Sequence, residues 1–266
     1  MVLTMALIGT LLWYGDHPYR AAIEEIKRIG FDYFELSLDY PLPEACDANK
    51  LKILIKDLGI EIAFHSPLDI FLAQPRREIF EASLKVFRKC LRFASNFETL
   101  YYNFHINWKS PTSPFLEVKE KIMENGIKAC EEAVRLGEEY NFDVCIEYDS
   151  NFDERFLVNG LKLTFDVGHF VVDEVKKNKN YMDSIKDFLN KFRDRIIAVH
   201  LHDCDVGKLI DHLSFGKGNL NIEKIVELVK DKNYILIETF WRDLNKDVVS
   251  YSDLKNNFNY IINLLK

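Results

Sequence analysis

Six residues that can bind a metal ion stand at separate places along the chain, each at the end of a short β-rich run. They are three histidines and three carboxylates: His65, His105, Glu147, Asp166, His200 and Glu238. Imidazole nitrogens and carboxylate oxygens are common ligands of divalent metal ions. A single such residue at a strand end is more often only hydrogen-bonded or solvated. The six can therefore form a metal site only if the fold brings them close together.

The alternation of short and long segments predicts a fold that does gather them. The β-rich runs lie near residues 5–9, 32–37, 60–65, 99–105, 143–148, 161–166, 196–202 and 234–239. Apolar residues recur at helical spacing in the segments 19–29, 79–93, 118–136, 222–229 and 254–265. Strictly alternating strands and helices build a parallel sheet, and eight strands in 266 residues predict a single α/β domain, a (β/α)₈ TIM barrel over residues 1–266. Only residues 149–160 link the fifth and sixth strands, which predicts a truncated fifth helix.

Side-chain parity places all six candidates on the inner face of this barrel. Successive side chains of a strand point to opposite faces, so the residues one and three before each candidate should face the helices. All twelve are apolar: Phe64, Ile62, Phe104, Tyr102, Ile146, Val144, Phe165, Leu163, Val199, Ile197, Ile237 and Ile235. Barrel enzymes keep their chemistry at the carboxyl ends of the strands, so the parity predicts one metal centre there.

Chain order divides the candidates into two neighbouring sets. His65, His105 and Glu147 end the third, fourth and fifth strands, and this nitrogen-rich trio favours Zn²⁺. The sixth, seventh and eighth strands end in an oxygen-rich set, which suits Mn²⁺, Co²⁺, Mg²⁺ or Zn²⁺: Asp166, His200 and Glu238. Glu147 can serve both sets, so the sequence predicts one metal ion and allows a second.

Charge and cysteine content indicate which partners and which cellular compartment to expect. A formal charge of −7 gives no general attraction to nucleic acid, although a local basic patch can exist within an acidic total. Five cysteines without a C-x-x-C pair indicate free thiols in a reducing compartment, so we expect a cytoplasmic protein. The apolar opening, residues 1–13, is shorter than the roughly 20 residues of a membrane helix, and we expect no membrane partner.

Three short motifs make the chain resemble a known superfamily. They are D-x-x-H at Asp166 and His169, H-L-x-D from His200, and H-x-x-x-G-x-G from His212. Together with the strand-end residues, they are similar to the xylose isomerase-like barrel superfamily over nearly the whole chain. That superfamily includes sugar and sugar-phosphate isomerases and epimerases, and also endonuclease IV.

The resemblance to the isomerases and epimerases implies a site with one divalent metal ion. Its ligands would be Glu147, Asp166, His200 and Glu238, and His169 would contact the substrate. The two glutamates would move a proton as base and acid on a small polyhydroxy carbonyl compound, with or without a phosphate. Epimerases of this type often carry an arginine six residues after the strand-seven histidine, where this chain has Val206.

The resemblance to endonuclease IV implies instead a zinc cluster that cleaves DNA at abasic sites. His65 and His105 would join Glu147 on one ion, the quartet would hold the next, and His169 and His212 would hold a third. That family places an aspartate two residues before the last histidine, where this chain has Ile210, so the third site lacks a ligand. A metal-binding barrel without catalytic activity is a third interpretation.

Three further residues are candidates for contacts with a substrate. Glu35 ends the second strand on the inward parity, and a purely structural contact would explain it equally well. His202 shares the inner face with His200 and is expected to support a ligand or to touch the substrate. Arg242 follows the eighth strand, where a basic residue can hold a phosphate but is usually only solvated.

Overall fold

The computed structural model describes residues 6–266, and the chain forms two compact units. The first unit contains the residues up to Leu11, Ala21–Phe34 and Thr164–Lys266, and the second contains Leu12–Arg20 and Glu35–Leu163. The single domain over residues 1–266 stays a prediction, and each unit is described by itself.

Within residues 6–266, eight parallel strands form a closed barrel in the order β1-β10-β7-β6-β5-β4-β3-β2. These strands are β1 (Leu7–Leu12), β2 (Tyr33–Ser37), β3 (Glu61–His65), β4 (Thr99–Phe104), β5 (Asp143–Glu147), β6 (Lys162–Asp166), β7 (Ile196–Leu201) and β10 (Tyr234–Ile237). The predicted (β/α)₈ barrel is confirmed, and seven strands agree with the predicted runs within one or two residues. The first strand continues three residues beyond its predicted end, and residue 5 of that prediction lies outside the described residues.

The described residues contain eight α-helices, distributed unevenly between the strands. They are α1 (Arg20–Ile29), α2 (Ala48–Leu58), α3 (Arg77–Ala94), α4 (Leu116–Tyr140), α5 (Val167–Lys176), α6 (Tyr181–Lys191), α7 (Ile222–Val229) and α8 (Tyr251–Leu265). Two 3₁₀ turns, η1 (Tyr14–Asp16) and η2 (Glu154–Phe156), complete the set. Only η2 lies between β5 and β6, so the truncated fifth helix is confirmed.

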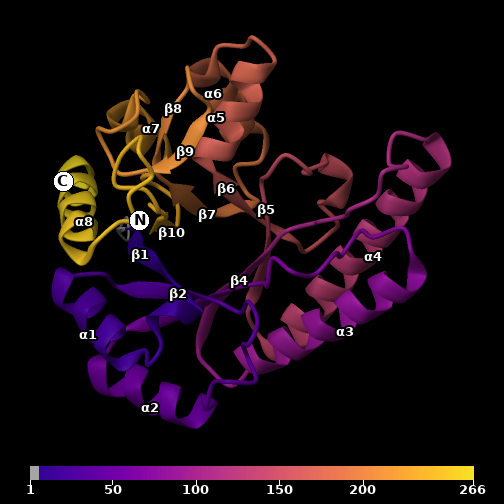
Figure 1. The fold of residues 1–266 in the computed structure, drawn as a ribbon, viewed down its shortest axis with the longest axis horizontal. Coiled ribbons are helices and arrows are strands. Elements are labelled where there is room, and N and C mark those ends of the chain that lie inside the picture. The colour runs from indigo at the N-terminus through magenta and orange to yellow at the C-terminus, as the bar shows by residue number, and fades with distance from the viewer. Residues whose placement is uncertain (1–5) are drawn as a thin grey trace. The chain divides into compact units, whose positions relative to one another are not determined.

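In the second unit, a short connection covers part of the core that a full helix would cover. Helices α3 and α4 lie side by side in Figure 1 and pack on each other. Phe156 of η2 is 1% exposed and lies against Gly126 of α4, where any larger residue would collide with its ring. A single aromatic side chain therefore takes over packing surface from the missing fifth helix.

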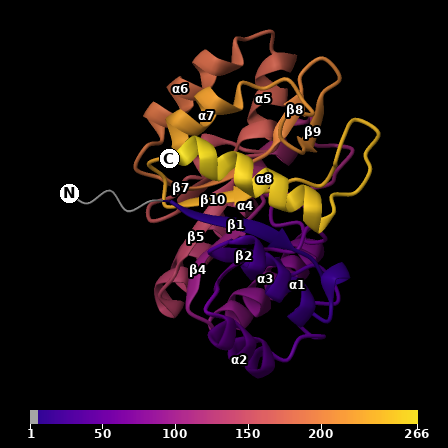
Figure 2. The same cartoon turned by 90° about the vertical axis from the view of Figure 1, so that its left-hand side faces the viewer.

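In the first unit, helices α5 to α8 each pack on the next one along the chain, and Figure 2 shows α6, α7 and α8 in this succession. β1 pairs in parallel with β10, and β10 with β7. The sequence does not reveal a two-stranded antiparallel sheet made of β8 (Asp203–Asp205) and β9 (Ile210–Leu213). This hairpin lies between β7 and α7 and carries His212 into the site.

None of the helices within residues 6–266 is both long enough and apolar enough to cross a membrane.

Candidate metal centre

All six strand-end candidates lie within one residue of the carboxyl end of a strand. His65, Glu147 and Asp166 are the last residues of β3, β5 and β6. His200 comes one residue before the end of β7, whereas His105 and Glu238 directly follow β4 and β10. Five of the six side chains are buried, and His105 is partly buried. The predicted positions of the residues on the strands are thus confirmed.

The nitrogen-rich trio of the second unit converges on one point. The two Nε2 atoms of His65 and His105 lie 3.2 Å apart. Glu147 Oε2 lies 3.3 Å from His65 Nε2 and 3.4 Å from His105 Nε2. A tetrahedral ion with bonds of about 2.0–2.1 Å separates its ligand atoms by about 3.3–3.4 Å. The spacing of the trio therefore fits a bound Zn²⁺.

The hydrogen bonds of the Nδ1 atoms of His65 and His105 show that the Nε2 atoms face the point of convergence. His65 Nδ1 lies 2.7 Å from the carbonyl oxygen of Ser66, and His105 Nδ1 lies 2.9 Å from Asp149 Oδ2. Both oxygens only accept hydrogen bonds, so each ring carries its hydrogen on Nδ1. The Nε2 lone pairs therefore point toward the Glu147 carboxylate. Three electron-rich atoms so close together repel one another unless a cation or a proton lies between them.

Two residues that support this trio were missed by the sequence reasoning. Asp149 orients His105, and Asn103 Nδ2 donates to Glu147 Oε2. Asn103 is fully buried, and its Oδ1 has no hydrogen-bond partner among the described residues. Asp149 lies two residues after Glu147 and so shares its parity, which is a signal that could have found it.

Replacement of Asp149 by alanine should lower the affinity of the trio for Zn²⁺ by about 10–100-fold, because His105 loses the acceptor that sets its orientation. Asparagine at the same position should restore much of the affinity, since its amide oxygen still accepts the hydrogen bond. Isothermal titration with Zn²⁺ measures both effects. Equal affinity for the wild type and Asp149→Ala would contradict this role.

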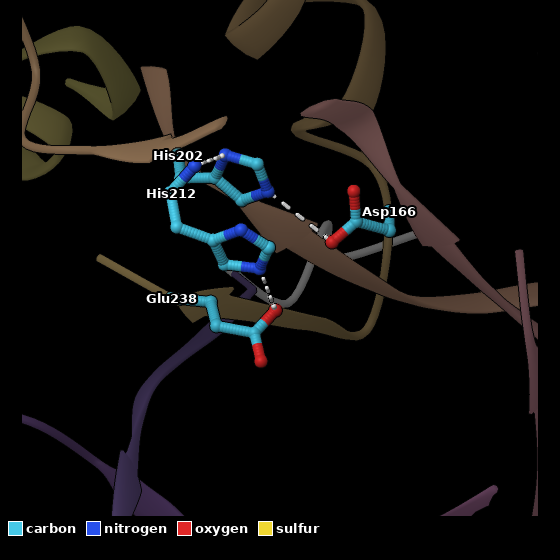
Figure 3. Close-up of side chains that lie close together, drawn as sticks. All are labelled: Asp166, His202, His212 and Glu238. Carbon is cyan, nitrogen blue, oxygen red and sulfur yellow. Dashed lines mark hydrogen bonds and ion pairs between the residues drawn. The ribbon is translucent and has the colours of Figure 1, made fainter. Parts of the chain in front are cut away.

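The first unit brings together a second group: Asp166, His202, His212 and Glu238 (Figure 3). His202 Nε2 lies 3.3 Å from Asp166 Oδ2, and His212 Nε2 lies 3.7 Å from Glu238 Oε2. The predicted ligand His200 contacts the same glutamate oxygen through Nδ1 at 3.0 Å. Three imidazoles and two carboxylates thus lie together, supplied by the ends of β6, β7 and β10 and, for His212, by β9.

The D-x-x-H motif lies at the start of α5. Asp166 is the N-cap of this helix, and its Oδ1 accepts the backbone N–H of His169 at 2.6 Å. This N-cap bond holds the backbone of His169 beside Asp166, whereas the histidine side chain is not required for it. Burial raises the pKa of Asp166, but His169, His202 and His212 outweigh it and hold that pKa below its usual range.

The H-x-x-x-G-x-G motif is organised by the buried carboxylate of Asp203. This side chain accepts four backbone N–H groups, those of Cys204 at 2.8 Å, Gly216 at 2.9 Å, Gly218 at 3.0 Å and Leu220 at 3.2 Å. Gly216 has a φ of 77°, and a side chain on Gly218 would collide with Asp203 and the Cys204 backbone. The two glycines therefore serve the fold of the loop that follows His212.

Asp203→Asn should lower the free energy of unfolding by about 3 kcal/mol, because hydrogen bonds to a charged acceptor are strong and the new amide NH₂ would face backbone donors. Urea unfolding of the metal-free chain measures the loss. Asp57→Asn, at an exposed position of α2, is the matched control and should change little. A loss below about 0.5 kcal/mol, the size of an ordinary surface substitution, would contradict the proposed anchor.

Asp211 contacts both His169 and His212. It stands one residue after the position at which endonuclease IV has an aspartate. Its Oδ2 lies 3.4 Å from His169 Nδ1, and its Oδ1 lies 3.2 Å from His212 Nδ1. The β8–β9 hairpin has an irregular register, and Leu209 and His212 have positive φ angles of 54° and 55°. This backbone turns Asp211 toward the histidines, so Ile210 at the usual position does not leave them without a carboxylate. A third metal ion belongs only to the endonuclease IV interpretation and stays an alternative.

The charges of this group perturb one another. Burial lowers the pKa of His212, but Asp211 and Glu238 beside its two nitrogens raise it to about 9. Burial raises the pKa of Asp211, but its hydrogen bonds with His169 and His212 hold it far below the usual range. The carboxylates are therefore arranged to favour positive charge on the imidazoles or beside them.

The remaining substrate candidates differ in their surroundings. His169 is about one-third exposed, so a ligand can reach it. Glu35 is fully buried on β2. Arg242 is half exposed and forms ion pairs with Asp243 and Asp247, which occupy the charge that a phosphate would need. The roles of all three stay predictions.

A closed parallel barrel with histidines and carboxylates at the carboxyl ends of its strands defines a TIM-barrel protein built around a potential metal centre. More particularly, the chain belongs to the xylose isomerase-like TIM barrel family, whose model matches residues 23–258.

Two curated relatives match most of the chain. A probable endonuclease 4 from Aquifex aeolicus is 27% identical over 76% of this chain and 78% of its own length. An uncharacterised protein from Methanocaldococcus jannaschii is 22% identical, and the match covers 98% of this chain and 92% of that protein.

Solved structures share the fold along nearly their whole length. A D-psicose 3-epimerase from Clostridium cellulolyticum has a TM-score of 0.77 and 16% identity, and the match covers 98% of this chain and 99% of that chain. A 3-keto-D-glucoside 4-epimerase from E. coli has the same TM-score and identity, with 97% of this chain and 99% of that chain covered.

Proposed function

We propose that this protein is a divalent-metal-dependent isomerase or epimerase that acts on a small sugar or sugar phosphate. The observation that carries the proposal is the buried pair of Glu238 and His200, 3.0 Å apart, in the same unit as the buried Asp166. Carboxylates with one imidazole suit Mn²⁺, Co²⁺, Mg²⁺ or Zn²⁺. The match in fold to two sugar epimerases over nearly their whole length supports the choice of substrate class.

In this proposal, Glu147, Asp166, His200 and Glu238 hold the ion. Glu147 belongs to the second unit, so its place in the quartet rests on the family pattern. When bound, the ion would act as a Lewis acid that makes a C–H group next to the carbonyl of an open-chain sugar more acidic. Glu147 and Glu238 would take and return the proton as base and acid, and the partly exposed His169 would contact the substrate.

Hydrogen exchange with the solvent tests the proposal directly. The protein, supplied with Mn²⁺ or Co²⁺, is incubated in D₂O with a panel of ketoses, aldoses and their phosphates, and deuterium is located by NMR. We expect deuterium at one carbon of at least one sugar, with formation of its epimer or isomer. If no sugar in the panel exchanges while the metal is bound, the proposal is contradicted.

A second candidate function, a zinc-dependent nuclease acting at abasic sites, is favoured by different residues. A one-metal proton transfer has no use for the Zn²⁺-like spacing of His65, His105 and Glu147, or for the approach of Asp211 to His169 and His212. The likeness to a probable endonuclease 4 supports this alternative. Three zinc ions per chain with cleavage of an abasic duplex would establish it, whereas one exchangeable ion without cleavage would exclude it.

A further inference from the structure

His202 is a fully buried histidine that follows β7 by one residue and contacts parts of the site that are distant in the sequence. It belongs to the group of four potential ligands in Figure 3. A ligand must turn a nitrogen lone pair toward the metal ion. The hydrogen bonds of the ring decide whether His202 can do so.

Both ring nitrogens of His202 have defined roles. The backbone N–H of His212 donates to His202 Nδ1 at 2.8 Å, and an amide N–H can only donate. Nδ1 therefore has no hydrogen, and its 3.2 Å approach to the carbonyl oxygen of Asp203 is not a hydrogen bond. The ring hydrogen lies on Nε2 and points to Asp166 Oδ2, 3.3 Å away (Figure 3). Neither nitrogen offers a lone pair to an ion.

Packing prevents the ring from turning to another orientation. One face of His202 stacks on the His212 ring, with centroids 4.0 Å apart and planes 13° apart. The His212 ring also stacks on Phe240, at 4.2 Å and 9°. The ring of His202 approaches Gly168 so closely that any side chain there would collide with it. The glycine in the D-V-G-H segment is thus explained by the room that His202 needs.

We propose that His202 is a positioning residue and not a metal ligand, an inference that rests on the proposed function. Its Nε2–H holds one oxygen of Asp166 while the His169 amide holds the other at 2.6 Å. Its Nδ1 holds the backbone of His212 in a positive-φ conformation. One imidazole therefore orients the predicted ligand Asp166 through Nε2 and separately holds the backbone of His212 through Nδ1.

Two amide substitutions separate these contacts. The amide nitrogen of a glutamine occupies about the place of Nε2, so His202→Gln keeps a donor for Asp166. The amide oxygen of an asparagine occupies about the place of Nδ1, so His202→Asn keeps only the acceptor for the His212 amide. His202→Phe keeps the shape and the stacking and loses both hydrogen bonds. Each variant is made in a His65→Ala chain, in which the trio of the second unit is disabled.

The affinity for Co²⁺ and the visible absorption spectrum of the bound ion provide the readout. We expect His202→Asn and His202→Phe to weaken Co²⁺ binding by about 10–100-fold and to alter the spectrum. We expect His202→Gln to bind within a few-fold of the parent with a similar spectrum. His17 is the one histidine of the seven outside these groups, and His17→Asn is the matched control and should bind as the parent does.

The outcomes distinguish this inference from the proposed function. If the parent chain binds no Co²⁺, both fail. If the parent binds Co²⁺ and all three variants bind it equally well, only the positioning role is overturned. Loss of binding in all three, His202→Gln included, would show that a donor to Asp166 is not sufficient, and it would also overturn the inference. Urea unfolding of each metal-free variant shows that it is folded, and should His202→Asn not fold, His202→Phe carries the test.

Discussion

Replacement of Glu238 by glutamine is expected to slow deuterium exchange into the substrate sugar by about 10²–10⁴-fold, the usual contribution of a general acid or base. Glutamine keeps the size of the side chain and an oxygen that can face the ion, but it cannot accept a proton at neutral pH. Glu238 is 5% exposed, and its Oε2 lies 3.0 Å from His200 Nδ1, so the glutamine should fit without a large rearrangement.

The measurement is the initial rate of deuterium incorporation at saturating sugar, with the metal content determined on the same sample. Glu227→Gln, on the exposed face of α7, is the matched control and should exchange at the wild-type rate. If Glu238→Gln retained its metal and exchanged at more than a tenth of the wild-type rate, another residue would have to move the proton.

Replacement of Glu147 by glutamine should affect the metal-bound protein far more than the metal-free protein. An amide NH₂ in place of Oε2 can donate to the Nε2 atoms of His65 and His105, which now face a carboxylate oxygen at 3.3 and 3.4 Å. Asn103 Nδ2 donates to that same oxygen, so the Asn103 amide has to turn its Oδ1 toward the new NH₂. The metal-free variant should therefore be about as stable as the wild type. Affinity for Zn²⁺ should fall by more than the roughly 10–100-fold expected for a residue behind the ligands, because Glu147 would bind the ion itself.

Urea unfolding with and without Zn²⁺ measures both effects in one experiment. At a free Zn²⁺ concentration 100 times the dissociation constant, wild-type protein should gain about 2.7 kcal/mol, and the variant should gain little at that concentration. Glu131→Gln, on the exposed surface of α4, should behave as the wild type does. An unchanged gain in Glu147→Gln would remove Glu147 from the centre.

The strands and their inward residues could be predicted because both depend on short-range patterns. Apolar residues at the outward positions indicate the parity of β3 and β5, and this parity predicts that His65 and Glu147 point inward. The (β/α)₈ fold follows from the same alternation. The short link between β5 and β6 left room for no more than a turn such as η2.

The residues that support the trio could not be predicted from such patterns. Asn103 stands two residues before His105 and so shares its inward parity, and only its contact with Glu147 distinguishes it from other inward residues. Asp149 shares the parity of Glu147, but its role depends on the direction of the His105 ring. Ring orientation is decided by hydrogen bonds between distant residues, which spacing along a chain does not record.

The hairpin shows why a motif comparison was insufficient at Asp211. The motif comparison expects the aspartate two residues before His212, where this chain has Ile210, and Asp211 comes one residue later. The positive φ angles at Leu209 and His212 redirect the backbone, and Asp211 reaches His169 as well as its neighbour. Neither residue is a glycine, so the sequence carries no clear sign of these angles.

Asp166 couples the folding of the first turn of α5 to the arrangement of the predicted metal ligands. Its Oδ1 begins α5 by accepting the His169 amide, and its other oxygen faces His202. If the first turn of α5 frays, the carboxylate loses its orientation and His169 leaves the group at the same moment. The rate at which the His169 amide proton exchanges with water therefore reports on both events. The exchange is slower the larger the fraction of molecules in which the site is assembled.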